Sequence, residues 1–574
     1  MPGALLGAHL AGLIFFLNPQ IPFTALRVGR ATVLYGLLLG AFGLALQLPW
    51  TWRRTDRALR LLPWTLTIAL GLGALLDAAH ASIYAFYLPA GINVRLLKTA
   101  IWLALGALIA FYTALLHTLH QRRYGWRSRW ALALLSILSL VAVAERREAF
   151  RAPAELRARQ PAVEPSRGSR LWVIGLDGAT LDAILPLAGQ GRLPAFAALL
   201  REGAYGRLES LNPTRRAAVW ITLATGKYPF KHGVTGELPH GGGLLGERWT
   251  LLPRGIGFRV WGLLGARPTR EAPARHALAL WEILDRLGLA SAVVAWPSAW
   301  PPVGSGTVIS ERFFRAQGAS GEVRPSDLTA LVEGARVREE DLDPATLATL
   351  GAKPSPGAAA ALAGDLWREA IALSLGEAGE EDRGSPAIVR RLVVLSGLAE
   401  ASRADFGGFH AAQFLGDSTP SAQEAARRVA GYYEHLDRFV GTVLARDRNA
   451  LVAVVSAHGV APVGWWERAQ GAKAQGGSFG GGPDGVLMLH GPGVRAGALL
   501  TGARLVDVAP TLLYALGLPV ARDFDGRVLT PAFEASFLAR RPLSFFPSYE
   551  ALGPLPPTAA GAQSPLRGAP PLTP

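Results

Sequence analysis

Two side chains of the types that can bind metal ions or move protons follow closely after apolar, β-branched runs. Asp177 follows Leu171–Leu176, and His458 comes two residues after Leu451–Ser456. Such runs, alternating with helical stretches, predict a mostly parallel sheet that is covered on both faces. The reactive groups of these sheets lie in loops at the carboxyl ends of the strands. We therefore expect Asp177 and His458 at one edge of the sheet.

Further runs extend this pattern along the carboxy-terminal part of the chain. Strands are expected at Ser291–Ala295, Thr307–Ser310, Leu392–Ser396 and Val486–His490. Helices are expected at Pro194–Glu202, Ala277–Leu287, Ala359–Leu373, Ser421–Ala445 and Leu505–Leu516. The pattern predicts an α/β domain over 170–535 with an inserted cap at about 317–390 and a disordered, Pro-rich tail at 553–574.

The amino-terminal part has a different composition. Hydrophobic residues make up 50% of the chain and charged residues 18%, below the roughly 25% of charged residues in soluble proteins. Apolar runs lie at roughly 3–17, 31–50, 61–79, 99–118 and 130–144. A spanning helix needs about 20 apolar residues. The runs predict an all-α region of about five transmembrane helices over 1–145, followed by a linker at 146–169, and a membrane as a partner.

Most of the net charge of +15 belongs to this amino-terminal part, because residues 1–160 hold 17 Lys/Arg and 5 Asp/Glu. The basic residues lie between the apolar runs, which is typical of membrane-flanking charge and excludes a nucleic-acid surface. Four successive loops carry two, four, two and four Lys/Arg. The positive-inside rule then predicts a cytoplasmic amino terminus and a carboxy-terminal domain outside the cytoplasm. Asp77 and His80, at the end of the third run, are functional candidates or interfacial residues that water solvates.

Several motifs occur in the order of a known family. They are LWVIGLDGATLDAI, LPAFAALLREGAYGRLESLNPTRRAAVWITLATGKYPFKHGV, WEILDRLGLASAVVAWPSAWPP, YYEHLDRFVG, VVSAHG, GGPDGVLMLHGPGV and LVDVAPTLLYALGLP. Together they cover about residues 170–530 and resemble the type I phosphodiesterase/nucleotide pyrophosphatase branch of the alkaline phosphatase superfamily. The resemblance implies an α/β core with two divalent metals, usually zinc, which neutralise a phosphate ester and activate a Ser or Thr alkoxide.

The resemblance also implies seven protein groups at such a site. They are an Asp after the first strand, the nucleophile, an Asp four residues before a His, the Asp and His of a DHG turn, and a late His. Asp177, His410 and His458 match and would be remnant metal ligands. The other four positions do not match: Arg216 replaces the Ser or Thr nucleophile, and the remaining positions hold Phe406 (with Asp405 one place away), Ala457 and Phe479.

These replacements argue against the usual chemistry. A zinc ion needs about four ligands, and the permanent cation of Arg216 is neither a ligand nor a nucleophile. A shifted alignment would instead make Thr214 or Thr222 the nucleophile, and other ligands could be recruited. The candidates for recruitment are His232, Asp405, Asp437, His435 and His490.

Arg215 and Arg216 allow two interpretations that the sequence leaves open. Guanidinium groups at a helix amino terminus could bind a phosphate or a phospholipid head group, or Arg216 could pair with Asp177 and fill an inactive pocket. We expect a catalytically impaired, membrane-anchored family member that binds a phosphorylated ligand or a protein partner outside the cytoplasm. The alternative is an active metal-dependent phosphodiesterase or phosphotransferase for lipid-linked or nucleotide phosphate esters.

Overall fold

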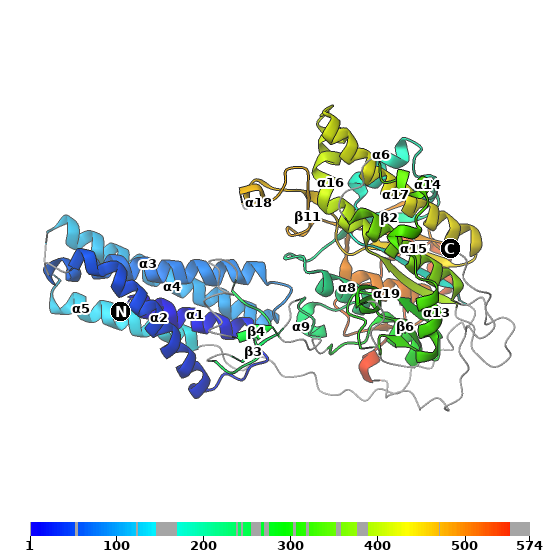
Figure 1. Ribbon diagram of the computed structural model, residues 1–574. Coiled ribbons are helices and arrows are strands. Elements are labelled where there is room, and N and C mark those ends of the chain that lie inside the picture. The colour runs from blue at the N-terminus through cyan, green and yellow to red at the C-terminus, as the bar shows by residue number, and fades with distance from the viewer. Residues whose placement is uncertain are drawn as a thin grey trace. The chain divides into compact units, whose positions relative to one another are not determined.

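The chain forms two compact units. The computed structural model describes residues 2–51, 55–121, 124–144, 169–236, 239–242, 245–253, 266–268, 275–301, 306–316, 321–351, 357–375, 389–469 and 471–551 (Figure 1). Unit 1 comprises Met1–Ala154 and Glu237–Pro273, and unit 2 comprises Glu155–Gly236 and Ala274–Pro574. The segment 237–273 therefore belongs to the unit of the amino-terminal helices although it interrupts the sequence of unit 2.

Unit 1 is built from long apolar helices: α1 (Pro2–Leu17), α2 (Ala25–Thr51), α3 (Thr55–Ile83), α4 (Ala90–Leu119) and α5 (Trp126–Ala144). Three stretches of the described residues are long and apolar enough to cross a membrane, namely Ala25–Leu46, Pro63–Ile83 and Ala90–Leu119. Helix α1, with 16 residues, falls short of that length. The predicted apolar helices are present, but the predicted count of five spans stays a prediction.

Helices α1 and α2 approach each other closely because glycine lines their contact. A Cβ atom on Gly3 would lie 2.3 Å from the carbonyl oxygen of Leu39, and one on Gly7 would lie 2.3 Å from that of Tyr35. Small residues of this kind let helices pack backbone to backbone in a membrane.

The segment 249–252 binds the loop that joins α1 to α2. Asn18, with no exposed surface, accepts hydrogen bonds at Oδ1 from the backbone N–H of Thr250 at 2.8 Å and of Leu251 at 3.1 Å. Its Nδ2 donates to the carbonyl of Leu251 at 2.8 Å. Tyr84 donates to the carbonyl of Leu252 at 2.9 Å. Asn18 thus satisfies backbone groups that lie more than 230 residues away in the sequence.

Asp77 and His80 are buried in this unit, at 3% and 2% exposure. The Nδ1 atom of His80 lies 2.7 Å from the carbonyl oxygen of Leu76. The interpretation of both residues as solvated interfacial side chains is therefore wrong for the described structure, since the surrounding helices exclude water from them.

Unit 2 is organised around a nine-stranded sheet with the order β13-β2-β12-β9-β1-β8-β5-β6-β7. The five central strands, which run parallel, are β9 (Leu451–Ser456), β1 (Leu171–Leu176), β8 (Arg390–Leu395), β5 (Ala292–Val294) and β6 (Thr307–Ile309). The outer strands are β12 (Gly485–His490), β2 (Ala204–Glu209), β13 (Ala498–Arg504) and the short β7 (Val323–Arg324). Strands β12 and β7 run antiparallel to their inner neighbours. The predicted mostly parallel α/β sheet is confirmed.

Helices cover both faces of this sheet (Figure 1). The larger ones are α6 (Leu181–Gly189), α7 (Pro194–Glu202), α8 (Arg216–Thr225), α11 (Leu280–Arg286), α15 (Ala358–Ser374), α16 (Gly397–Phe414), α17 (Pro420–Arg446) and α19 (Leu505–Ala515). The shorter ones include α9 (Pro229–His232), α12 (Glu311–Ala316), α13 (Thr329–Gly334), α14 (Pro344–Ala348), α18 (Trp465–Ala469) and α20 (Ala535–Arg540). The expected cap region contributes to the core, because α15 packs against β8 and α16.

Strand β1 contacts both helical layers. Trp172, Ile174 and Leu176 belong to the core cluster that also contains residues of α7 and α17. On the other face, Gly175 leaves space for α8, since a Cβ atom there would lie 2.7 Å from the ring of Trp220. This close approach brings the first turn of α8 toward the carboxyl end of β1.

Candidate functional site

Four side chains converge where the central parallel strands end. Asp177 directly follows β1, His458 comes two residues after β9, and Glu311 comes two residues after β6. Arg216 is the first residue of α8. Parallel strands present their carboxyl ends at the same edge, so three distant segments deliver these groups together. The expectation that Asp177 and His458 share this edge is confirmed by their contact.

Asp177 is the centre of the cluster, with a side chain that is 1% exposed. Its Oδ1 accepts a hydrogen bond from the indole Nε1 of Trp220 at 3.1 Å and lies 3.0 Å from Nε2 of His458. Its Oδ2 accepts from Nε of Arg216. Both carboxylate oxygens are thus occupied by protein donors.

Arg216 bridges two carboxylates. Besides its bond to Asp177, its Nη1 donates to Oε1 of Glu311 at 2.5 Å. The same oxygen accepts from Nη2 of Arg315 at 2.6 Å. Nη2 of Arg216 is a buried atom that has no hydrogen-bond partner among the described residues. Because the side chain as a whole remains 29% exposed, the guanidinium lies at the boundary between the core and the cleft.

The charges of this cluster stabilise one another. Burial would raise the pKa of Asp177, but the positive charge of Arg216 and the hydrogen bonds from His458 and Arg216 outweigh burial and hold it well below its usual range. Burial would likewise lower the pKa of Arg216, and the charges of Asp177 and Glu311 raise it instead. The pair therefore stays ionised throughout the physiological pH range.

The residues around His458 do not suit a divalent metal. Ala457 offers no donor, and Phe479 packs edge-on against the imidazole with ring centroids 5.4 Å apart. Phe479 also lies beside Gly178, since a Cβ atom there would be 3.2 Å from its ring. Among the described residues, no three His, Cys, Asp or Glu side chains converge as a metal site would require. The two-metal centre that the resemblance implies does not fit these residues.

His410 does not join Asp177 and His458 as the predicted third ligand. Ala399, in the first turn of α16, lies beside Gly178, at 3.4 Å from a Cβ atom built there. His410 is eleven residues further along the same helix, about 16 Å at the usual helical rise, where its ring lies against Phe414 with centroids 5.0 Å apart. The helix therefore places an alanine beside Gly178 and carries His410 away from the cluster.

The two threonines considered as substitute nucleophiles are held elsewhere. Thr214 donates to the carbonyl of Leu211 at 3.2 Å. Thr222 has no exposed surface, and its hydroxyl lies 2.9 Å from Nε2 of His232. Because Nδ1 of His232 accepts from the N–H of Val234 at 3.1 Å, Nε2 carries the ring proton and donates it to Thr222. Burial, with the charge of Arg275, lowers the pKa of His232 to about 3, so the ring stays neutral.

Arg215, the other predicted phosphate-binding residue, turns away from Asp177. Its side chain is buried and Nη1 donates to the carbonyl of Thr235 at 3.2 Å. Arg215 precedes α8 as its N-cap residue and has an extended backbone, so the helix does not carry its side chain to the cluster. Of the two adjacent arginines, only Arg216 lies at the strand ends.

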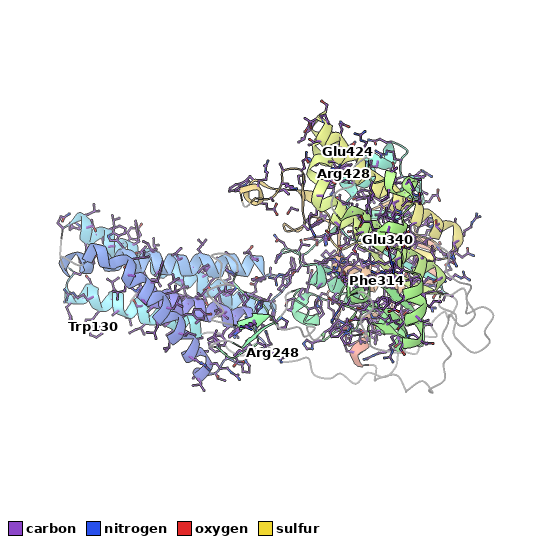
Figure 2. The ribbon with its side chains drawn as sticks, viewed as in Figure 1. Trp130, Arg248, Phe314, Glu340, Glu424 and Arg428 are labelled. Carbon is purple, nitrogen blue, oxygen red and sulfur yellow. The ribbon has the colours of Figure 1, made fainter. Side chains whose placement is uncertain are left out.

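The remaining candidates for recruitment have structural partners of their own. Asp405 binds Arg428 through two hydrogen bonds of 2.6 and 2.8 Å (Figure 2 marks Arg428), and Asp437 accepts from the first N–H groups of α7. His435 lies 2.9 Å from Glu369, and His490 lies 3.9 Å from Glu202.

Two members of the cluster, Glu311 and Trp220, were not foreseen from the sequence. A signal for Glu311 was available, because it directly follows the strand expected at Thr307–Ser310, in the same relation to its strand as Asp177. Trp220 gave no such signal, because an indole within an apolar helix is typical of core packing.

Part of this chain is similar to known proteins. The sequence model of the type I phosphodiesterase/nucleotide pyrophosphatase family matches residues 171–470. Murine ectonucleotide pyrophosphatase/phosphodiesterase 5, an inactive variant in complex with AMP, is 13% identical over 61% of this chain and 96% of that chain, with a TM-score of 0.38. Phosphonate monoester hydrolase from Silicibacter pomeroyi is 14% identical over 63% of this chain and 76% of that chain, with a TM-score of 0.34. No curated protein matches the sequence. On the family match, which covers more than half of its residues, the chain belongs to the type I phosphodiesterase/nucleotide pyrophosphatase family.

Proposed function

We propose that this protein is a membrane-anchored member of its family that binds a phosphorylated ligand without hydrolysing it, on the extracytoplasmic side. The observation that carries the proposal is the guanidinium of Arg216, which bridges Asp177 and Glu311 at the strand ends. It stands at the position where the family has its nucleophile, and it engages the aspartate that a metal would require.

An arginine at this position removes two elements of the family's reaction. A guanidinium has no alkoxide form and keeps its proton at any physiological pH, so no covalent phosphoryl intermediate can form on it. Its positive charge also repels a divalent cation by several kcal/mol at about 4 Å and intermediate dielectric. The donor set therefore supports neither the nucleophile nor the metals of the usual hydrolysis.

The same arginine suits a phosphate ester. Guanidinium groups bind phosphate oxygens with charge-assisted, often bidentate hydrogen bonds. Nη2 of Arg216 has no partner among the described residues, and Arg315, 64% exposed, supplies a second guanidinium on Glu311. A phosphate oxygen that accepts from Nη2 would complete the hydrogen bonding of Arg216 and would compete with Glu311 for both cations.

The binding proposal is tested by calorimetry with a non-hydrolysable phosphodiester and with inorganic phosphate, on the purified full-length chain. The variant Arg216→Gln should lower the affinity at least tenfold, since a charge-assisted pair contributes about 1.5–3 kcal/mol. The matched control is Arg207→Gln, which removes an exposed arginine of unit 2 that pairs with Asp182 and should leave the affinity unchanged. Equal affinities for wild type and Arg216→Gln would refute the proposal.

The absence of hydrolysis needs its own measurement. We expect less than one zinc per chain by elemental analysis and no turnover of a chromogenic phosphodiester. About two zinc per chain, with turnover that Asp177→Ala abolishes, would instead establish an active hydrolase.

Sidedness is tested separately with reporter fusions. Alkaline phosphatase and a fluorescent protein, fused after Arg60 and after Arg151, should report opposite sides of the membrane, with the second position outside the cytoplasm. Reporters on the same side would contradict the extracytoplasmic assignment and leave the ligand-binding test unaffected.

A further inference from the structure

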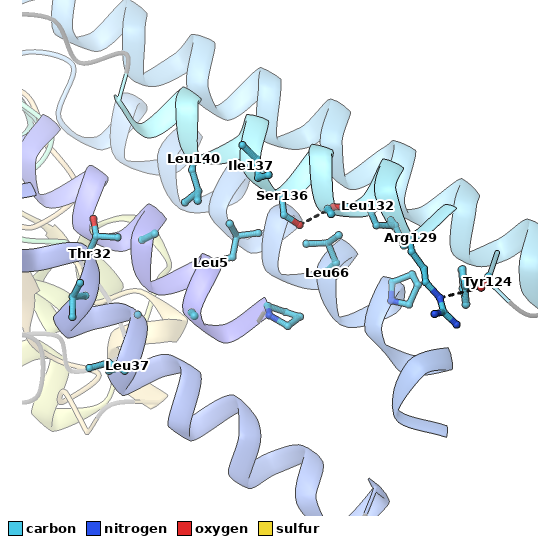
Figure 3. Close-up of a pocket in the computed structure, with 17 residues that line it drawn as sticks. Leu5, Thr32, Leu37, Leu66, Tyr124, Arg129, Leu132, Ser136, Ile137 and Leu140 are labelled. Atoms are coloured by element: carbon cyan, nitrogen blue, oxygen red, sulfur yellow. Dashed lines mark hydrogen bonds between the residues drawn. The ribbon is translucent and has the colours of Figure 1, made fainter. Parts of the chain in front are cut away.

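A cavity of about 690 Å³ lies within unit 1, between four of its helices (Figure 3). It is lined by 17 residues from α1, α2, α3, α5 and the turn before α5, of which only Thr32, Tyr124, Arg129 and Ser136 are polar. Its volume falls within the range of about 300–1,000 Å³ that is usual for ligand sites. The cavity is therefore large enough for a ligand and almost wholly apolar.

The cavity has a buried floor and an open side. Leu5, Leu66 and Leu132 are between 5% and 8% exposed and form part of the floor. At the open side, Leu37 of α2 and Ile137 of α5 line the cavity, and they are 68% and 58% exposed. In a chain whose helices α2, α3 and α4 are apolar enough to cross a membrane, such an open side faces hydrocarbon, so an occupant can enter laterally.

Two of the four polar lining residues, Arg129 and Tyr124, lie at one end of the cavity. Figure 3 shows Arg129 and Tyr124 together there, with Leu140 toward the opposite end. Nε of Arg129 donates to the carbonyl of Tyr124 at 3.1 Å, which holds the guanidinium at this end of the cavity. Trp126 and Trp130, 73% and 56% exposed, flank Arg129 in sequence (Figure 2 marks Trp130). Exposed tryptophans beside an arginine are typical of the level of lipid head groups.

The length of the cavity matches one lipid leaflet. Arg129 and Leu140 are eleven residues apart on α5, or about 16 Å along the helix. Half of the hydrocarbon core of a bilayer is about 15 Å. An acyl chain that lies along α5 with its head group at Arg129 would therefore end near Leu140.

The basic residues near this end of the cavity favour one kind of lipid head group. Two stretches of sequence, 50–62 and 119–130, span the changeover from α2 to α3 and from α4 to α5, and alternating topology places both on the same side of the membrane. Together they contain eight arginines and one acidic residue, Asp56. Clusters of four to eight basic residues beside a membrane helix attract anionic lipids, at about 1 kcal/mol per residue. An anionic phosphate head group is complementary to this end of the cavity.

We propose that this cavity is a binding site for one acyl chain of an anionic phospholipid whose phosphate is held by Arg129. The site is independent of the proposed ligand of unit 2, because its residues belong to unit 1 alone. It predicts a lipid that remains with the protein through purification.

The test compares two lipids that share their acyl chains and differ in head-group charge. Native mass spectrometry of the full-length protein in nanodiscs of equal parts phosphatidylglycerol and phosphatidylcholine should show phosphatidylglycerol retained in about fivefold excess. The variant Arg129→Gln should remove most of that excess. Its matched control is Arg30→Gln, an exposed arginine at the start of α2 that does not line the cavity, which should preserve the excess.

A second variant tests the cavity itself. Ala133→Phe fills the lined space, whereas Leu105→Phe enlarges an exposed residue of α4 outside it. The first should abolish retention of either lipid, and the second should retain phosphatidylglycerol as wild type does. Equal retention of both lipids by wild type, or retention unaffected by Ala133→Phe, would overturn the proposal.

Discussion

Strand β1 carries an aspartate cluster at each of its ends, and the two clusters use similar donors. At the carboxyl end, Asp177 binds Arg216, the indole of Trp220 and His458. At the amino end, Asp447 binds Arg170 at 2.6 Å, the indole of Trp172 at 2.9 Å and Arg391 at 3.4 Å. Both carboxylates have side chains that are 5% exposed or less. Neither burial nor ion pairing therefore distinguishes a functional site from a structural one in this protein.

The arginines of the two clusters differ in their hydrogen-bond partners. Arg391 donates from Nε to the carbonyl of Leu375 at 2.6 Å and lies over the ring of Trp172, 4.9 Å from its centroid. Arg216 instead meets a second carboxylate, Glu311, and keeps a buried Nη2 without a partner among the described residues. The proposed ligand would satisfy the free donor at the carboxyl edge of the sheet, whereas the network at the amino edge needs no ligand to explain it.

The substitution with the largest expected effect on stability is Asp447→Asn. It leaves Arg391, whose side chain is 9% exposed, without its counter-charge, and breaking a buried pair from one side costs about 3 kcal/mol or more. Thermal unfolding of the full-length protein in detergent measures the loss. The exposed pair of Asp182 with Arg207 provides the control Asp182→Asn, and a loss no larger than that of the control would contradict a structural role for Asp447.

The substitution Asp177→Asn should cost less, about 2 kcal/mol, because Arg216 retains Glu311 as a partner. The same unfolding measurement compares the two strand ends directly. In addition, the loss from the double variant Asp177→Asn with Arg216→Gln should be smaller than the sum of the single losses, since the two residues form one network. Additive losses would show that Asp177 and Arg216 do not act as one network.

The pH dependence of that comparison follows from the pKa of Asp177. Its carboxyl has a lower pKa in the folded state than the value of about 3.9 for an unfolded chain. The unfolded state therefore binds more protons at acidic pH, and the stability that Asp177 contributes is complete above about pH 4 and is lost as the pH falls below it. The difference in melting temperature between wild type and Asp177→Asn should stay constant from pH 8 to pH 5 and shrink below pH 4. A difference that instead grows on acidification would contradict the sign.

Much of the fold was predictable because the central strands consist of apolar residues, and such composition is typical of buried strands. The expected bounds of β1, β9 and α7 agree with the structure at both ends, since buried parallel strands are continuous apolar runs and Pro194 marks the start of its helix. Strands β2 and β13 were not predicted. Their alternating exposure gives a weaker signal than a continuous run, and β2 contains a glycine whose place in a strand only its neighbours explain.

The site was predictable in part. Asp177 and His458 follow strands, so their position at one edge required only the topology of a parallel sheet. His410 was predicted from its residue type, but its position along α16 keeps it away from the cluster. The pairing of Arg216 with Glu311 joins residues 95 positions apart, and no local pattern reports such a distance. The contact of Asn18 with Leu251 was hidden for the same reason.

The smallest expected effect on stability belongs to Arg170→Gln, at the amino end of β1. Its bond to Asp447 is short, at 2.6 Å, but the side chain is 43% exposed, and ion pairs in water contribute about 1 kcal/mol or less. Asp447 also keeps Trp172 and Arg391 after the change. By contrast, Arg216→Gln at the carboxyl end leaves Asp177 buried without a cation and should cost about 2 kcal/mol. Unfolding of the two variants under one condition checks the order. If Arg170→Gln were the more damaging, the exposed arginine rather than the buried carboxylate would govern these clusters, and the distinction between the two ends of β1 would have to be abandoned.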